Sequence, residues 1–91
     1  MGEGVRLAMK EFNIAREELF ITTKILPWSL GKEKTKKSIE TSLKNLDLGY
    51  IDLMLIHFPG AKDLKPNDIR NKTLRHETWK VMEEYVGKGL I

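Results

Sequence analysis

The sequence has no cysteine, few prolines, and no apolar run near the length of a membrane span. Without cysteine, disulfide bonds, thiolate catalysis and zinc–thiolate sites are excluded, and we predict no metal site. A transmembrane helix needs ~20 consecutive apolar residues, so we expect no membrane contact. Residues 1–6 lack the apolar core of a signal peptide. These absences together favour a cytoplasmic protein.

Charge of one sign is also scarce, because 16 lysines and arginines against 13 acidic residues leave a net charge of +3. The densest basic stretch, residues 32–37, is interrupted by Glu33. A mixed run of this kind is typical of a solvated helix face. Nucleic-acid binding would require a denser basic patch and steeply salt-dependent affinity, so we expect no nucleic-acid partner.

The longest apolar stretch covers residues 51–57 and is interrupted only by Asp52 before it ends at His57. Such a run predicts a parallel strand that is buried on both faces. Pro59 and Gly60 follow, and they end the strand because proline cannot donate to a ladder and glycine permits a sharp turn. We expect Asp52 to be a cap or an ion-pair partner near the start of this strand.

A second apolar stretch, residues 19–24, predicts a strand that ends in Lys24. Between the two strands, residues 32–46 form an expected helix with apolar residues at helical spacing, namely Ile39, Leu43 and Leu46. A strand–helix–strand connection of this length suits a crossover between parallel strands. Lys24 and His57 would then lie at the same carboxyl edge, where α/β proteins place catalytic and binding groups.

Two further helices are expected on either side of this unit. The first covers about residues 5–12. The second covers about residues 74–86 after a polar loop whose length favours a binding or lid role. The apolar side of the second helix is predicted to carry Trp79, Met82 and Val86 as core residues, with Tyr85 beside them.

The predicted class is therefore α/β, with two parallel strands at about residues 19–24 and 51–57 and three helices. Two strands leave both sheet edges open, and an open edge pairs readily with another strand. We therefore interpret the chain as a piece of a larger repeating βα protein that can self-associate through its edges.

Three motifs carry a family resemblance, and they read LFITTK at residues 19–24, SLKNL at residues 42–46 and YIDLMLIHFP at residues 50–59. They resemble the aldo-keto reductases, which usually have a strand ending in Ser/Thr-Lys, a helix ending in Ser-Leu-x-x-Leu, and then Tyr-Ile-Asp-Leu-x-Leu-Ile-His-Trp/Phe-Pro. The resemblance implies a fragment of a (β/α)8 TIM barrel. Residues 1–91 would be a partial NADP-dependent oxidoreductase domain, about one third of such a barrel.

The resemblance also implies reduction of an aldehyde or ketone by NADPH or NADH. In this family a tyrosine is the general acid, a lysine lowers the pKa of that tyrosine from about 10, and a histidine polarises the carbonyl oxygen. Lys24 matches the lysine and His57 matches the histidine. Trp28 and Phe58 would line the pocket for the small-molecule carbonyl substrate.

The tyrosine and aspartate of the family's active site match no residue of this chain, and most of the cofactor site has no counterpart. The resemblance therefore implies that the chain alone is inactive. One alternative is a non-catalytic α/β fragment that acts by binding a partner through exposed strand edges. A lone histidine at a strand end is more often structural and a lone lysine is usually solvated, so a structural role stays open for His57 and a solvated position stays open for Lys24.

Overall fold

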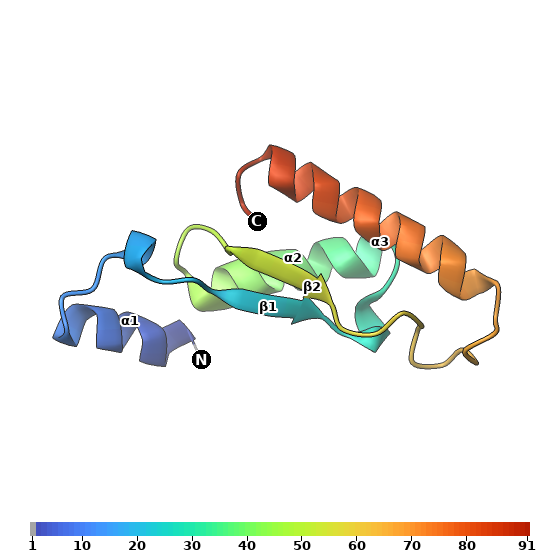
Figure 1. The fold of residues 1–91 in the computed structure, drawn as a ribbon, viewed down its shortest axis with the longest axis horizontal. Helices are drawn as coiled ribbons and strands as arrows, with labels where there is room; N and C mark the ends of the chain where they lie inside the picture. The colour runs from blue at the N-terminus through green and yellow to red at the C-terminus, as the bar shows by residue number, and fades with distance from the viewer. Residues whose placement is uncertain (1) are drawn as a thin grey trace.

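A computed structural model of the chain describes residues 2–91, within which two strands and three α-helices follow one another (Figure 1). The elements are α1 (Gly2–Glu11), β1 (Thr22–Ile25), α2 (Lys32–Leu46), β2 (Leu53–Ile56) and α3 (Arg70–Gly87). Two short 3₁₀ helices, Arg16–Glu18 and Pro27–Ser29, precede and follow β1. The predicted α/β class and the predicted order of elements are confirmed.

The two strands pair in parallel, as predicted, and Lys24 lies opposite Leu55 in the ladder. Both strands are shorter than the expected limits of 19–24 and 51–57. The main difference is at the amino end of the sheet, where regular pairing begins several residues later than the apolar pattern suggested.

The late start of the ladder follows from the position of Asp52. The Ile21 carbonyl accepts the N–H groups of both Asp52 and Leu53, at 3.0 and 3.1 Å. The Ile21 N–H donates to the Asp52 carboxylate at 2.7 Å, and Arg16 pairs with the same carboxylate at 2.8 Å. A side chain thus takes the place of a ladder partner. The expectation that Asp52 is an ion-pair partner near the strand's start is confirmed.

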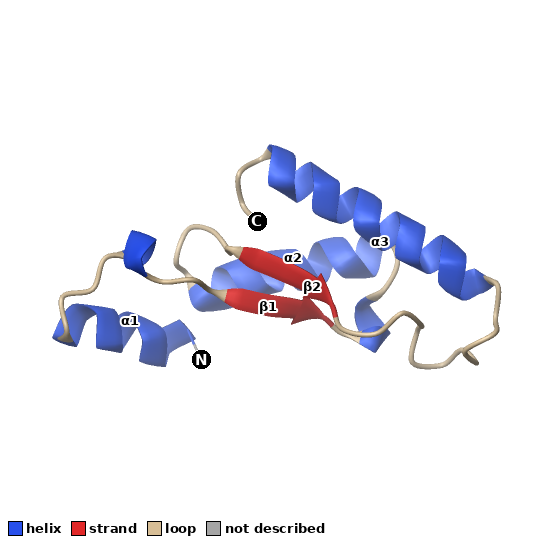
Figure 2. Cartoon of the chain, in the orientation of Figure 1, coloured by secondary structure: helices blue, strands red, loops and turns tan. Residues whose placement is uncertain are grey.

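Helices cover only one face of the sheet. Ile25 and Met54 are buried on the covered face, where α2 crosses behind the strands (Figure 2). Leu53 and Leu55 point to the other face and remain 40% and 41% exposed. The prediction that the strand at residues 51–57 is buried on both faces is therefore wrong, because nothing among residues 2–91 packs on the second face.

The core lies between the covered face, α2 and α3. Its buried apolar side chains are Ile25, Leu30, Ile39, Leu46, Ile51, Met54, Val81, Met82 and Tyr85. The predicted boundaries of α2 are confirmed, and so is its apolar stripe: Ile39 and Leu46 are buried, and Leu43 packs against them.

The third helix differs from its prediction in start and orientation. It begins at Arg70, and the Asp68 carboxylate just before it accepts the N–H of Arg70 at 2.9 Å. Met82 is buried as expected, but Trp79 and Val86 are 57% and 60% exposed and are not core residues. The buried side of α3 faces α2, whereas Trp79 and Val86 turn toward the free edge of β2.

Candidate functional site

Lys24 and His57 lie at the carboxyl end of the sheet on its open face. Lys24 is the penultimate residue of β1, and His57 follows β2 directly. Side chains alternate along a strand, so the pairing of Lys24 with Leu55 places these two residues and His57 on the same face. The His57 N–H donates to the Ile25 carbonyl at 2.9 Å, which holds the histidine backbone against β1. The side chains of Lys24, Leu55 and His57 are exposed.

The loop after His57 is held by the first turns of α3. The buried Asn71 side chain accepts the Ala61 N–H at 2.9 Å and donates to the Lys65 carbonyl at 2.8 Å. Arg75 donates to the Pro59 carbonyl at 2.6 Å. These bonds fix the direction in which the chain leaves β2.

The predicted pocket residues lie on the two loops that follow the strands. Trp28 belongs to the 3₁₀ helix after β1, and Phe58 follows the histidine; they are 57% and 54% exposed. The Lys62 N–H donates to the Pro27 carbonyl at 3.1 Å, and the Lys62 ammonium lies 5.8 Å from the centre of the Trp28 ring. The two loops are therefore joined beside Trp28.

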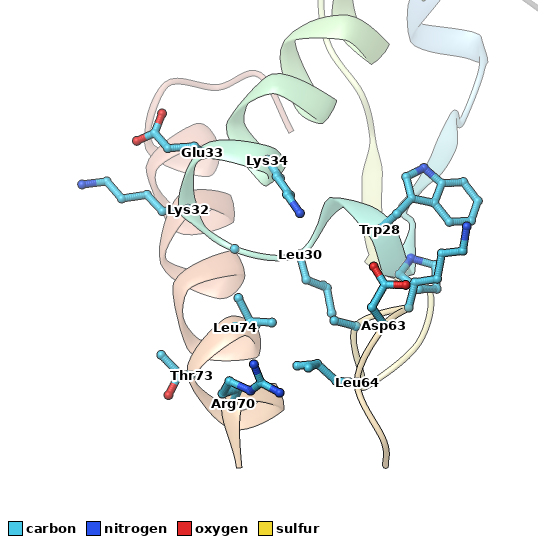
Figure 3. A pocket seen from close by; sticks show the side chains of 14 residues that line it. Trp28, Leu30, Lys32, Glu33, Lys34, Asp63, Leu64, Arg70, Thr73 and Leu74 are labelled. Atoms are coloured by element: carbon cyan, nitrogen blue, oxygen red, sulfur yellow. The ribbon is translucent and has the colours of Figure 1, made fainter. Parts of the chain in front are cut away.

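A hollow of about 560 Å³ opens between the loop after β1, the first turn of α2 and the first turn of α3 (Figure 3). Its lining includes Trp28, Leu30, Lys34, Leu64, Arg70 and Leu74. A second hollow of about 530 Å³ is shared by Trp28 and Lys24. His57 and Phe58 line neither hollow. The structure thus brings Lys24 and His57 to one edge and places Trp28 beside Lys24, but it gathers no pocket around all four residues.

A buried polar cluster ties the loop that carries Trp28 to α3. The Thr78 hydroxyl accepts the Gly31 N–H at 2.9 Å and lies 3.2 Å from the Thr35 hydroxyl. Thr35 also donates to the Ser29 carbonyl at 2.8 Å. Both threonines are fully buried. This cluster fixes the first turn of α2 relative to α3.

The sequence reasoning missed Asn71, Thr35 and Thr78, because polar side chains were not considered for buried positions. A signal was present for one of them. Thr78 stands three residues before Val81 and seven before Tyr85, so it belongs to the helical stripe that is buried.

Two of the groups with perturbed pKa values, Asp52 and Tyr85, lie away from the carboxyl edge, whereas Arg70, which lines the 560 Å³ hollow, lowers the pKa of Asp68 to about 2. At the amino end of the sheet, the Ile21 N–H and then Arg16 hold the pKa of Asp52 below its usual range. In the core, burial and the hydrogen bond to Glu40 raise the pKa of Tyr85 to about 12. The shifts of Asp52 and Tyr85 make the free energy of unfolding depend on pH.

Within residues 2–91, no cluster of three or more His, Cys, Asp or Glu side chains could hold a metal ion. In the same part of the chain, no helix has the length and apolar character needed to cross a membrane.

Residues 3–91 match the profile of the aldo/keto reductase family. Over 89 residues the chain is 40% identical to the glyoxal reductase of Bacillus subtilis (strain 168). This match covers 98% of this chain and 28% of that protein. The aldose reductase of Schistosoma japonicum matches with a TM-score of 0.79 and 37% identity, over 98% of this chain and 33% of the other. An aldo-keto reductase of Bombyx mori in complex with NADP matches with a TM-score of 0.78 and 38% identity, over 98% of this chain and 28% of the other. The chain thus spans 28 to 33% of the length of these relatives.

Proposed function

The chain belongs to the aldo/keto reductase family, as its three motifs indicated, and from that premise we propose that it contributes Lys24 and His57 to a carbonyl reductase. The proposed reaction converts an aldehyde or a ketone into an alcohol, with NADPH or NADH as reductant. In this proposal Lys24 lowers the pKa of a general-acid tyrosine, and His57 faces the carbonyl oxygen. Trp28 and Phe58 are proposed to line the substrate pocket.

The observation that supports this proposal most is the parallel register of the two strands. Lys24 lies opposite Leu55, two residues before His57, so both polar side chains belong to the open face near its carboxyl end. In barrels of parallel strands, catalytic groups come from the carboxyl ends of several strands. A carbonyl group that approaches the open face there would reach both side chains.

The described residues do not enclose a nicotinamide nucleotide. Lys24 and His57 are exposed, and nothing among residues 2–91 covers the face on which they lie. A bound nucleotide would supply the hydride, but no contact to it follows from these residues. We therefore propose that the 91 residues alone do not reduce a carbonyl substrate, in line with a chain that covers 28% of glyoxal reductase.

The test is a chimera in which this chain replaces the matching 28% of glyoxal reductase, assayed for NADPH-dependent reduction of glyoxal. We expect an active chimera in which Lys24→Met and His57→Ala each lower kcat/KM by about 10²- to 10⁴-fold. Lys44→Met, an exposed change on α2, is the matched control and should leave the rate unchanged. Full activity of the Lys24 and His57 variants in the folded chimera would refute the assignment.

The alternative function is a non-catalytic α/β fragment that binds a partner through an exposed strand edge. One observation favours it: the free edge of β2 lies beside the exposed side chains of Trp79 and Val86. Concentration-dependent association of the chain without binding of NADPH would favour this function over the reductase.

A further inference from the structure

The loop of residues 57–69 connects β2 to α3 and leaves the sheet at its carboxyl end (Figure 1). One buried side chain in the first turn of α3, that of Asn71, holds this loop at two places. Its amide accepts the Ala61 N–H at 2.9 Å and donates to the Lys65 carbonyl at 2.8 Å. Asn71 is only 2% exposed, so water does not compete for these two hydrogen bonds. A single side chain therefore ties both halves of the loop to α3.

The buried Gly60 lets the loop backbone approach the Asn71 amide closely. A Cβ atom at position 60 would lie 3.3 Å from the Asn71 Nδ2 and 3.4 Å from its Oδ1. Removal of the Asn71 amide would leave the Ala61 N–H without its partner, which is costly for a group that is partly buried. Gly60 and Asn71 therefore form a closely fitted contact that holds the loop in one conformation.

A second side chain of α3 holds the start of the same loop. Arg75, about one turn after Asn71, donates to the Pro59 carbonyl at 2.6 Å. On the other side of Phe58, the His57 N–H donates to the Ile25 carbonyl of β1 at 2.9 Å. The backbone of Phe58 therefore lies between two fixed positions, one held by the sheet and the other by Arg75.

The loop that Asn71 holds also contacts the loop that carries Trp28. The residue after Ala61 is Lys62, whose N–H donates to the Pro27 carbonyl at 3.1 Å. Its ammonium lies 5.8 Å from the centre of the Trp28 ring. The hydrogen bond from Asn71 therefore acts on both loops after the strands, the one with Phe58 directly and the one with Trp28 through Lys62.

We propose that Asn71 and Arg75 are positioning residues of the carbonyl site, and we call the pair the α3 clamp. In this proposal the clamp contacts no substrate and acts through Phe58 and Trp28, which it holds as the wall of the substrate pocket. The inference rests on the proposed function, where these two aromatic residues line that pocket. The backbone of His57 is held by β1 rather than by the clamp. Loss of the clamp should therefore raise KM for the carbonyl substrate and leave kcat nearly unchanged.

The experiment compares variants of the chimera with glyoxal reductase. Arg75 is exposed, so Arg75→Ala leaves the core intact, and it should raise KM for glyoxal at least about threefold. Asn71→Ala should raise it at least about tenfold, because both loops lose their fixed position. In both variants kcat and KM for NADPH should stay within about twofold of the unmodified chimera. Arg75→Lys keeps a donor and should recover part of the loss. Lys72→Ala, an exposed change on the same helix, is the matched control.

Two further measurements separate positioning from general stability. In a Phe58→Ala chimera, Arg75→Ala should raise KM less than it does beside an intact ring, because part of what it positions is gone. Hydrogen exchange in the 91-residue chain tests the clamp without catalysis: the Ala61 amide should exchange slowly, and faster in Asn71→Ala. A merely structural role would instead reduce the fraction of active chimera, which lowers kcat and leaves KM unchanged.

The outcomes distinguish this inference from the proposed function. If Phe58→Ala raises KM for glyoxal but Arg75→Ala and Asn71→Ala behave like Lys72→Ala, the clamp is refuted and the pocket assignment stands. A fall in kcat at constant KM in the clamp variants also refutes it. If Phe58→Ala and Trp28→Ala both leave KM unchanged, the pocket assignment itself is wrong and the clamp has no wall to position. Should Asn71→Ala fail to fold, Arg75→Ala decides by the same criteria.

Discussion

Replacing Thr78 by valine removes the polar tie between α2 and α3 without changing the shape of the side chain. The Thr78 hydroxyl is fully buried, accepts the Gly31 N–H at 2.9 Å and donates to the Leu74 carbonyl at 2.7 Å. The variant leaves the buried Gly31 N–H without a partner, which costs about 1–3 kcal/mol. The Leu74 carbonyl keeps its helical backbone hydrogen bond, so the loss of the bond from the Thr78 hydroxyl to this carbonyl costs little free energy. We expect the free energy of unfolding to fall by about 2 kcal/mol.

Urea and thermal unfolding measure this loss. In a domain of this size, 1 kcal/mol corresponds to about 4–8 °C, so Tm should fall by about 8–16 °C. Thr73→Val, an exposed change on the same helix, is the control and should stay within about 0.5 kcal/mol of the unmodified chain. Thr78→Ser keeps the hydroxyl and should lose less than the valine variant. A Thr78→Val chain with unchanged Tm would refute a stabilising role for the tie.

Two pH-dependent predictions follow from the shifted groups. The Ile21 N–H depresses the folded pKa of Asp52, so its stabilising effect is present above the unfolded pKa of about 4 and is lost as the pH falls through the folded pKa. Asp52→Asn should therefore destabilise the chain at pH 7 in urea unfolding and flatten the acid limb of its stability profile; an unchanged acid limb would contradict this. Burial and Glu40 raise the folded pKa of Tyr85 to about 12, so its contribution is present below the unfolded pKa of about 10 and is lost as the pH rises through the folded value. Ultraviolet titration of a Tyr50→Phe chain should show the Tyr85 phenolate only near pH 12, and ionisation near pH 10 in the folded chain would count against the buried hydrogen bond.

The arrangement of strands and helices could be predicted because local patterns carry it. The apolar run before Pro59 and Gly60 indicated a strand, and the helical spacing from Ile39 to Leu46 indicated the buried side of α2. Parallel pairing followed from the length of the connection between the strands. The resemblance to the family rests on the same segments, because the motifs lie on β1, α2 and β2.

The errors arose where burial depends on what lies next to an element. Trp79 and Val86 have apolar side chains at helical spacing, but they face the free edge of β2 rather than α2. Leu53 and Leu55 likewise face away from the helices. An apolar pattern indicates a surface that packs against other residues, but it does not show whether those residues belong to the described part of the chain. Thr78 shows the converse, since its hydroxyl is buried among partners that the pattern does not reveal.

The most direct test of the account measures whether Lys24 and His57 act as one unit. In the chimera with glyoxal reductase, kcat/KM for glyoxal with NADPH is compared for Lys24→Met, His57→Ala and the double variant. Residues that serve one catalytic step are strongly non-additive, so the double variant should be little slower than the slower single variant. Losses that multiply in full, or single variants that lose nothing, would contradict the claim that these two residues form one active-site pair.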